Sequence, residues 1–288
     1  TPLYSSAASD VYKRQDLQQG VIRAIGKPQE RFGEDHLRML RAVRFAARME
    51  FAIDPATWRA IREHADKLSR ISAERIGMEL EYILTDPSRG RGGKLLLEAG
   101  FAGTIFPGVA AEMLAGGLKV LETWSRRIGF GPALAALLCY ANAGQVSKVC
   151  RHLKTSNDIR HQAVWLVTHQ EKLLTAMPMS KGPLKQWLSE PLFETLVKLL
   201  RCRLRAEGCS QTVLLRLRRQ IRELGDEPVA PPPLLDGHDL MQLGCPAGPL
   251  LGRLIEELYL AQLENQVADA PQARRWAREW LDRHRETS

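Results

Sequence analysis

Acidic and basic side chains alternate at helical spacing in a short stretch that contains Glu34, Asp35, Arg38 and Arg41. Asp35 precedes Arg38 by three residues, so in a helix a carboxylate and a guanidinium project from neighbouring turns. A fixed carboxylate accepts hydrogen bonds and a fixed guanidinium donates several, so the pair can match the edge of a nucleotide base. The alternative is an ordinary helix whose charged face is solvated and carries weak ion pairs.

The element that must position these side chains is a single helix predicted over residues 31–51, RFGEDHLRMLRAVRFAARMEF. Leu37, Leu40, Val43 and Ala47 recur at steps of three and four, which predicts an apolar stripe facing a core. The charged residues recur at the same spacing on another side of the same helix. One helix would therefore carry both a buried face and a charged face.

Two further helices are predicted close behind. One begins near Pro55, with Asp54 as its N-cap, because proline suits the first helical position. Another begins after Ser72, a good N-cap. In this helix Arg75 and Glu79 lie four residues apart, a spacing that predicts an ion pair along the surface.

The remaining periodicity is helical nearly everywhere. Residues 20–25 form the only plausible strand, which needs a partner because a lone strand is not stable. Glycine-rich residues 88–94 predict a break, residues 110–225 a run of helices, and proline-rich residues 225–237 a semi-rigid connector. The sequence therefore predicts an all-α fold with at most one short strand.

Composition narrows the class of partner. The 288 residues are 44% hydrophobic and 26% charged, and the net charge is +8. A basic globular chain favours an anionic partner, and nucleic acid ranks above a membrane surface because no basic amphipathic anchor or signal peptide stands out. No apolar run approaches the roughly 18 residues of a membrane span. Five scattered cysteines fit a reducing, cytoplasmic environment.

Arginine-rich helices offer candidate RNA contacts. Seven arginines lie within residues 201–222, and a short helix, a Gly/Pro turn and a longer helix follow the connector. Exposed arginines bind phosphates through counterion release, and helix N-termini also bind phosphate. The alternatives are a soluble helix face and a compact helical hairpin. The candidate RNA-binding residues are Arg216, Arg218, Arg219, Gly248 and Arg253.

Residues that would mark a catalytic centre are missing from the sequence. No Asp-x-Asp pair occurs, so the two-metal carboxylate set of nucleotidyl transfer is not visible. No glycine pair has the flanking residues of a phosphate-binding loop. His238-Asp239 lacks the ordered partner histidines of a metal phosphohydrolase. The residues alone therefore indicate binding chemistry rather than catalysis.

Four segments resemble one known family in the same order: residues 16–51, 71–80, 152–160 and 237–258. They are similar to the bacterial tRNA nucleotidyltransferases, or CCA-adding enzymes, and to the related poly(A) polymerases. The string RF-x-ED-x-LR-x-LRA-x-RF is the most specific part. The similarity covers about residues 16–265, although Lys27 and His36 depart from the usual pattern without removing a base-reading residue.

The resemblance implies a role for each residue of the opening motif. Asp35 and Arg38 would hydrogen-bond the base of an incoming CTP or ATP without a nucleic-acid template. Glu34 would hold their orientation, and Arg41 resembles a supporting arginine next to the nucleotide. A second motif, matched by Arg75 and Glu79, would brace the helix turn near that pocket.

The resemblance also implies a division of the chain. In the family a mixed α/β head is followed by helical neck, body and tail domains in an elongated array. We expect a non-native tail at residues 1–15, a remnant of the head at 16–29 and a neck that recognises the base at 30–108. A helical body would follow at 109–225, and a linker and tail that bind tRNA at 226–288.

Only the last segment of the head is recognisable, so the resemblance implies that the metal-binding carboxylates are absent. Mg²⁺ would be bound by that missing head, CTP and ATP would be the substrates of the intact enzyme, and the chain alone would be inactive. The tail string favours tRNA as the partner. The alternatives are a poly(A) polymerase of the same family and a non-catalytic helical RNA-binding module.

Overall fold

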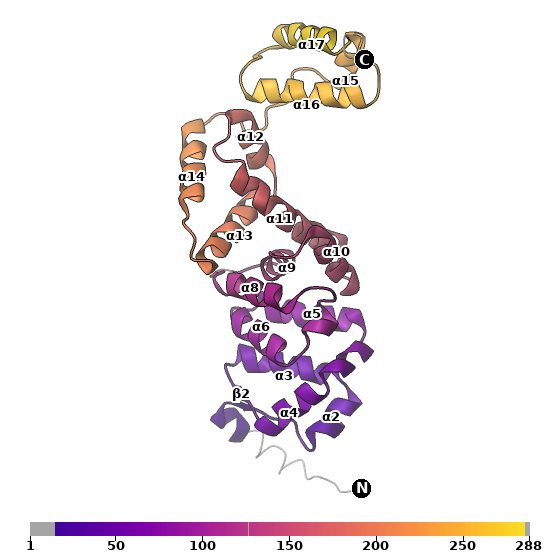
Figure 1. The fold of residues 1–288 in the computed structure, drawn as a ribbon, viewed down its shortest axis with the longest axis vertical. Coiled ribbons are helices and arrows are strands. Elements are labelled where there is room, and N and C mark those ends of the chain that lie inside the picture. The colour runs from indigo at the N-terminus through magenta and orange to yellow at the C-terminus, as the bar shows by residue number, and fades with distance from the viewer. Residues whose placement is uncertain (1–14, 126, 286–288) are drawn as a thin grey trace. The chain divides into compact units, whose positions relative to one another are not determined.

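The structure, a computed structural model, describes residues 15–125 and 127–285. The expected non-native tail at residues 1–15 therefore lies, apart from Gln15, outside the described residues. Helices account for nearly all the regular structure, as Figure 1 shows, and the only strands among the described residues are two short ones. The all-α class is confirmed.

The contacts divide the chain into two compact units. Unit 1 contains the described part of Thr1–Lys172 together with Thr195–Gln211, and unit 2 contains Leu173–Glu194 and the described part of Thr212–Ser288. These bounds differ from the predicted neck, body and tail, which remain a prediction.

The helices of the N-terminal half are α2 (Pro28–Glu34), α3 (Leu37–Arg48), α4 (Pro55–Glu63), the 3₁₀ helix η1 (Ala65–Arg70), α5 (Ala73–Thr85), α6 (Arg89–Glu98), α7 (Ala102–Ile105), α8 (Ala111–Glu122) and α9 (Phe130–Leu137). They are followed by α10 (Ala143–His152), α11 (Asn157–Thr175), α12 (Lys181–Ser189), α13 (Phe193–Ala206), α14 (Thr212–Leu224), α15 (Gly237–Gln242), α16 (Pro249–Leu263) and α17 (Ala270–Arg285).

The single helix predicted over residues 31–51 is wrong: two helices occupy this stretch. Helix α2 starts at Pro28, which needs no N–H at a first helical position. Asp35 then takes an extended conformation, with φ −152° and ψ 105°, and ends α2. Its carboxylate accepts the N–H of Leu37 at 3.0 Å, which satisfies one of the unpaired donors at the start of α3. Asp35 is therefore a break that starts a new helix.

The predicted strand has a partner that the sequence did not reveal. Strand β1 (Val21–Ile22) pairs in parallel with β2 (Ala52–Ile53), and Val21 lies opposite Ala52. The N-cap predicted at Asp54 is confirmed, because its side chain accepts the N–H of Thr57 at 3.0 Å. The strand pair joins the segment before α2 to the segment after α3.

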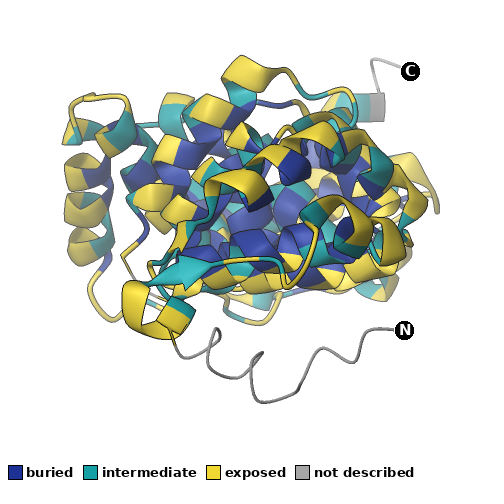
Figure 2. Cartoon of the chain, turned by 90° about the horizontal axis from the view of Figure 1, so that it is seen from below, coloured by how far each residue is buried: buried dark blue, intermediate teal, exposed yellow. Residues whose placement is uncertain are grey.

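The core of unit 1 forms along α3. Leu37, Leu40, Val43 and Ala47 are at most 3% exposed, which confirms the predicted apolar stripe. Helix α3 packs against α5 and α6, α6 packs against α8, and α8 packs against α9. Figure 2 shows that buried residues lie towards the inside of the ribbon and exposed residues towards the outside.

The glycine-rich break predicted at residues 88–94 is also wrong, because these residues form the start of α6. A Cβ built on Gly92 would lie 2.7 Å from Ile83 Cγ2, and one on Gly93 would lie 2.6 Å from Leu118 Cδ1. The glycines therefore allow α6 to approach α5 and α8 closely, and this packing offsets their low helix propensity.

A close backbone contact fixes α5 against the turn between α10 and α11. A Cβ built on Gly77 would lie 2.9 Å from the carbonyl oxygen of Leu153. Beside it, Lys154 Nζ lies 2.7 Å from Glu74 Oε1. This turn belongs to the segment 152–160 that the sequence singled out, and it positions the helix that carries Arg75 and Glu79.

Unit 2 has its own core, built from α15, α16 and α17. Leu254 on α16 and Trp280 on α17 are at most 1% exposed within it. The indole N–H of Trp280 donates to Glu257 at 2.6 Å, so the buried ring keeps a polar partner. Helix α12 packs against α16, where the N–H of Gly182 donates to Glu264.

The proline-rich connector is held in place within unit 2. Glu227 accepts Lys181 at 2.7 Å and Lys185 at 3.0 Å, and the side chain of Lys185 is only 4% exposed. The hydrogen bonds from Lys181 and Lys185 hold the pKa of Glu227 at about 2, below its ordinary value of 4.5. Further along the connector, the Tyr259 hydroxyl donates to the carbonyl oxygen of Pro231 at 3.1 Å.

Gly77→Ala should destabilise unit 1 by about 1–3 kcal/mol, because the added methyl group forces the α5 backbone away from the Leu153 carbonyl. Urea unfolding followed by circular dichroism measures the change. Gly103→Ala in α7 is the matched control, because a Cβ there has no neighbour within 4 Å. Equal stability of Gly77→Ala and the wild type would show that the contact is not tight.

Acid should weaken unit 2 through Glu227. Its folded pKa lies below its unfolded value, so its stabilising contribution is complete above about pH 4.5 and is lost as the pH falls towards about 2. The thermal midpoint of Glu227→Gln should therefore lie below that of the wild type at pH 7, and the two should converge as the pH falls. A gap that stays constant with pH would contradict the assignment.

Candidate functional site

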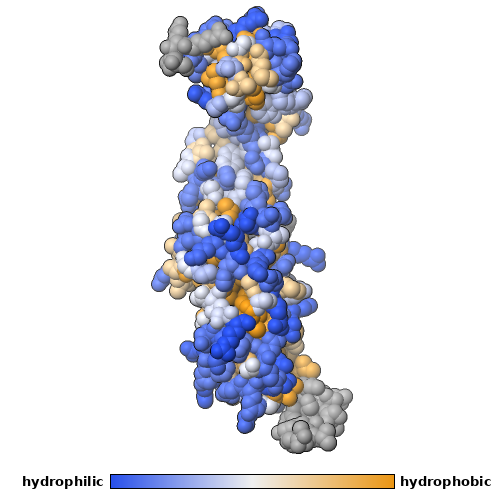
Figure 3. Space-filling model, turned by 90° about the vertical axis from the view of Figure 1, so that its right-hand side faces the viewer, coloured by the Kyte–Doolittle hydropathy of each residue, from blue (hydrophilic) through white to orange (hydrophobic). Residues whose placement is uncertain are grey.

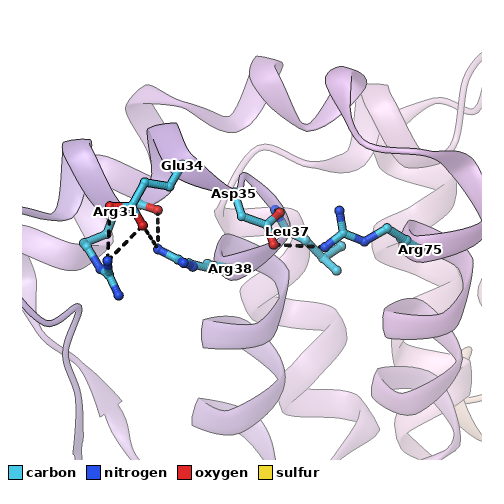
Figure 4. A network of polar contacts seen from close by, with 6 residues as sticks. All are labelled: Arg31, Glu34, Asp35, Leu37, Arg38 and Arg75. Carbon is cyan, nitrogen blue, oxygen red and sulfur yellow. Dashed lines mark hydrogen bonds and ion pairs between the residues drawn. The ribbon is translucent and has the colours of Figure 1, made fainter.

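Asp35 lies at the junction of α2 and α3, as Figure 4 shows, and both of its carboxylate oxygens are engaged. One oxygen accepts the N–H of Leu37, and the other accepts Arg75 Nη2 at 2.9 Å. The side chain of Asp35 is 26% exposed, so the carboxylate also faces solvent. Because each oxygen has two lone pairs, each can accept a further donor from a ligand.

Arg38 is held on the other side of the same junction. Its Nη1 donates to Glu34 Oε2 at 2.6 Å and to the carbonyl oxygen of Arg31 at 3.0 Å. Arg31 also donates to both oxygens of Glu34, at 2.8 and 3.1 Å. Since these bonds use only Nη1 of Arg38, its Nε and Nη2 groups remain as donors for a ligand.

The local charges favour ionised carboxylates at this junction. Partial burial raises the pKa of Asp35, but the Leu37 N–H and the Arg75 guanidinium outweigh it, and the net pKa is lowered. The hydrogen bond from Arg38 lowers the pKa of Glu34. Asp35 is therefore a pure acceptor and Arg38 a pure donor at neutral pH.

The carboxylate of Glu79 lies under this surface, between α3 and α5. Glu79 is 5% exposed. Arg41 Nε donates to its Oε1 at 3.0 Å, and Arg44 Nε lies 3.0 Å from its Oε2. Two guanidiniums therefore share one buried carboxylate.

The predicted surface pair of Arg75 and Glu79 is wrong within the described part of the chain. Arg75 reaches across to Asp35, while Glu79 turns inward to Arg41 and Arg44. The four-residue spacing indicates only that two side chains share a helix face. Packing against α3 supplies both residues with partners of opposite charge that are remote in sequence.

Sequence reasoning missed Arg44. It follows Arg41 by three residues on α3, and this spacing could have marked it as a second guanidinium facing α5. Its Cζ lies 4.5 Å from the ring centre of Phe45 and 5.1 Å from that of Tyr82. Arg44 thus joins the ionic contacts of the site to two aromatic side chains.

The candidate RNA-binding arginines of α14 are exposed and line a shallow groove in unit 2. Arg219 pairs with Glu223 at 2.8 Å. Arg216 and Arg218 form no ion pair with any residue that the structure describes. The groove is lined by Thr212, Leu215, Arg216, Arg218, Arg219, Ile221 and Arg222.

The other two candidates lie on α16, also in unit 2. Gly248 is the N-cap of this helix and has a φ of 130°, which favours glycine. Arg253 lies 4.0 Å from Glu257, and its guanidinium carbon is 6.0 Å from the ring centre of Trp280. Both residues therefore help to shape the start of α16.

The described residues contain no group of three or more His, Cys, Asp or Glu side chains that could hold a metal ion. Within the described residues, no such cluster is therefore present to hold Mg²⁺. The helices in the described ranges are also too short or too polar to cross a membrane. On the face shown in Figure 3, hydrophilic residues predominate over smaller hydrophobic areas.

Residues 50–113 match the family model described as the probable RNA and SrmB-binding site of polymerase A. The chain is 31% identical over 269 residues to the CCA-adding enzyme of Geobacillus stearothermophilus, an alignment that covers 88% of this chain and 62% of the relative. A relative from Lactobacillus gasseri, also a CCA-adding enzyme, is 28% identical with the same coverage. The chain thus spans 62% of the length of these curated relatives.

A crystal structure supports the same family. The CCA-adding enzyme of Bacillus stearothermophilus, solved in complex with CTP, matches with a TM-score of 0.70 and 28% identity, over 96% of this chain and 69% of that one. The sequence motifs, the helical fold and these relatives agree. The chain is therefore similar to the CCA-adding enzymes in sequence and in fold.

Proposed function

We propose that this chain carries the nucleotide-selecting and RNA-binding part of a tRNA nucleotidyltransferase. In the intact enzyme the reaction adds CMP and AMP to the 3′ end of tRNA. The observation that carries the proposal is the junction of α2 and α3, where an ionised Asp35 and a tethered Arg38 both face solvent. The similarity to the CCA-adding enzymes supports the reaction class.

The chemistry of the bases matches this pair of side chains. Cytosine and adenine each present an amino group next to an unprotonated ring nitrogen, which is a donor beside an acceptor. Uracil and guanine present a carbonyl oxygen next to a ring N–H, which is the reverse order. A carboxylate at Asp35 and a guanidinium at Arg38 therefore accept from and donate to cytosine or adenine, and oppose the other two bases.

The neighbouring contacts keep the pair in place. Glu34 and the Arg31 carbonyl restrain Arg38, while Arg75 and the Leu37 N–H restrain Asp35. Protein side chains that are already ordered lose less conformational entropy when a ligand binds. The base is therefore read by a rigid edge of protein, without a nucleic-acid template.

The arginines of α14 provide the second part of the proposal. Arg216 and Arg218 carry charges that no described carboxylate neutralises, and the chain has a net charge of +8. Such charges bind RNA phosphates by releasing counterions. Arg216, Arg218 and Arg219 would thus hold tRNA while the α2–α3 junction selects the nucleotide.

Asp35→Asn should reduce the preference of the chain for CTP and ATP over UTP and GTP by about tenfold, because a bidentate contact discriminates by about 1–3 kcal/mol. The amide keeps one oxygen to accept the Leu37 N–H. Calorimetric titration with each of the four nucleotides measures the preference. Asp66→Asn on η1 is the matched control. Unchanged selection in Asp35→Asn would remove Asp35 from base recognition.

Replacing Arg216, Arg218 and Arg219 with alanine should weaken tRNA binding. The slope of the logarithm of the association constant against the logarithm of salt concentration should also become shallower, by about one for each RNA phosphate that is no longer neutralised. Filter binding at several salt concentrations measures the slope. The triple lysine variant is the control, because it keeps the three charges. If the alanine variant retains the slope of the wild type, α14 does not contact the RNA backbone.

A further inference from the structure

An exposed apolar patch lies beside the candidate nucleotide site. Phe45 on α3 is 41% exposed, and Met78 and Tyr82 on α5 are 57% and 52% exposed. Arg38 and Phe45 are seven residues apart, so they lie on the same face of α3. On α5, Met78 follows Arg75, the partner of Asp35, by three residues, so the patch lies next to the edge formed by Asp35 and Arg38.

Arg44 fixes the two aromatic rings of this patch. Its guanidinium carbon lies within cation–π distance of both Phe45 and Tyr82, at 4.5 and 5.1 Å from their ring centres. Arg44 is itself anchored to the buried carboxylate of Glu79. The rings are thus held from beneath while much of their surface faces solvent.

The charge of the patch indicates the class of partner. Arg41 and Arg44 share the single carboxylate of Glu79, so one positive charge remains in excess. Exposed apolar surfaces of this kind mark binding sites. Flat apolar rings next to a positive charge suit the bases and phosphates of an unpaired nucleic-acid strand, because any base can stack on an aromatic ring.

We propose that Phe45 and Tyr82 form a stacking platform for the unpaired 3′-terminal nucleotides of the RNA, with the half-exposed Arg41 next to their phosphates. This inference rests on the proposed function, in which the RNA end must lie beside the incoming base. Seven residues of α3 separate Arg38 from Phe45, or about 10 Å at about 1.5 Å per residue. At about 3.4 Å per base, this distance corresponds to about three stacked bases.

The test compares two RNA hairpins, one with three unpaired nucleotides at its 3′ end and one that is blunt. Fluorescence anisotropy should show that the wild-type chain binds the tailed hairpin about tenfold more tightly. The double variant Phe45→Ala, Tyr82→Ala should lose most of this difference while its affinity for the blunt hairpin stays the same. Ile25→Ala, which removes another exposed apolar side chain of unit 1, should leave both affinities unchanged.

The double variant Phe45→Leu, Tyr82→Leu keeps apolar side chains and removes only the aromatic rings. It should therefore fold like the wild type, and a change in its binding reports the loss of the rings. It should lose the preference for the tailed hairpin as well. If the wild type binds both hairpins equally, or if the leucine variant keeps the preference for the tailed hairpin, the stacking platform is wrong. Neither result would contradict the proposed function. Failure of the wild type to bind either hairpin would overturn both proposals.

Discussion

The carboxylate of Glu79 is buried between α3 and α5, where a charge without a partner costs several kcal/mol. Arg41 and Arg44 supply that partner from α3, and Arg75 makes the reverse contact from α5 to Asp35. These ion pairs join two helices that are distant in sequence. The orientation of Asp35 depends on how these ion pairs align α3 with α5. The edge formed by Asp35 and Arg38, which is proposed to read the base, depends on the same alignment.

The site is built on helix ends and helix faces rather than on mobile loops. Asp35 ends α2 and accepts the N–H of Leu37 at the start of α3, so its backbone conformation and its side-chain direction are set together. Gly77 lets the turn after α10 press directly on α5, which places Arg75 opposite Asp35. The segment 152–160 therefore has a structural reason to be distinctive. It supports the helix that supports the site.

Periodicity in the sequence predicted the apolar stripe of α3, because burial follows the helical repeat. It could not predict the break at Asp35, since the charged residues Glu34, Arg38 and Arg41 keep helical spacing across it. The partners of Arg75 and Glu79 were missed for a related reason: spacing along one helix carries no information about the neighbouring helix. The low helix propensity of Gly92 and Gly93 predicts a break, whereas the close packing that offsets it cannot be seen in the sequence.

The central claim is that Asp35 and Arg38 read the edge of the base, and a crystal structure of the chain with CTP tests it most directly. The account predicts that the amino group of cytosine donates to Asp35 while Arg38 donates to the ring nitrogen and carbonyl oxygen of the base. The ion pairs of Glu79 with Arg41 and Arg44 should remain in place. A cytosine ring bound elsewhere, or bound with its edge turned away from Asp35 and Arg38, would contradict the account.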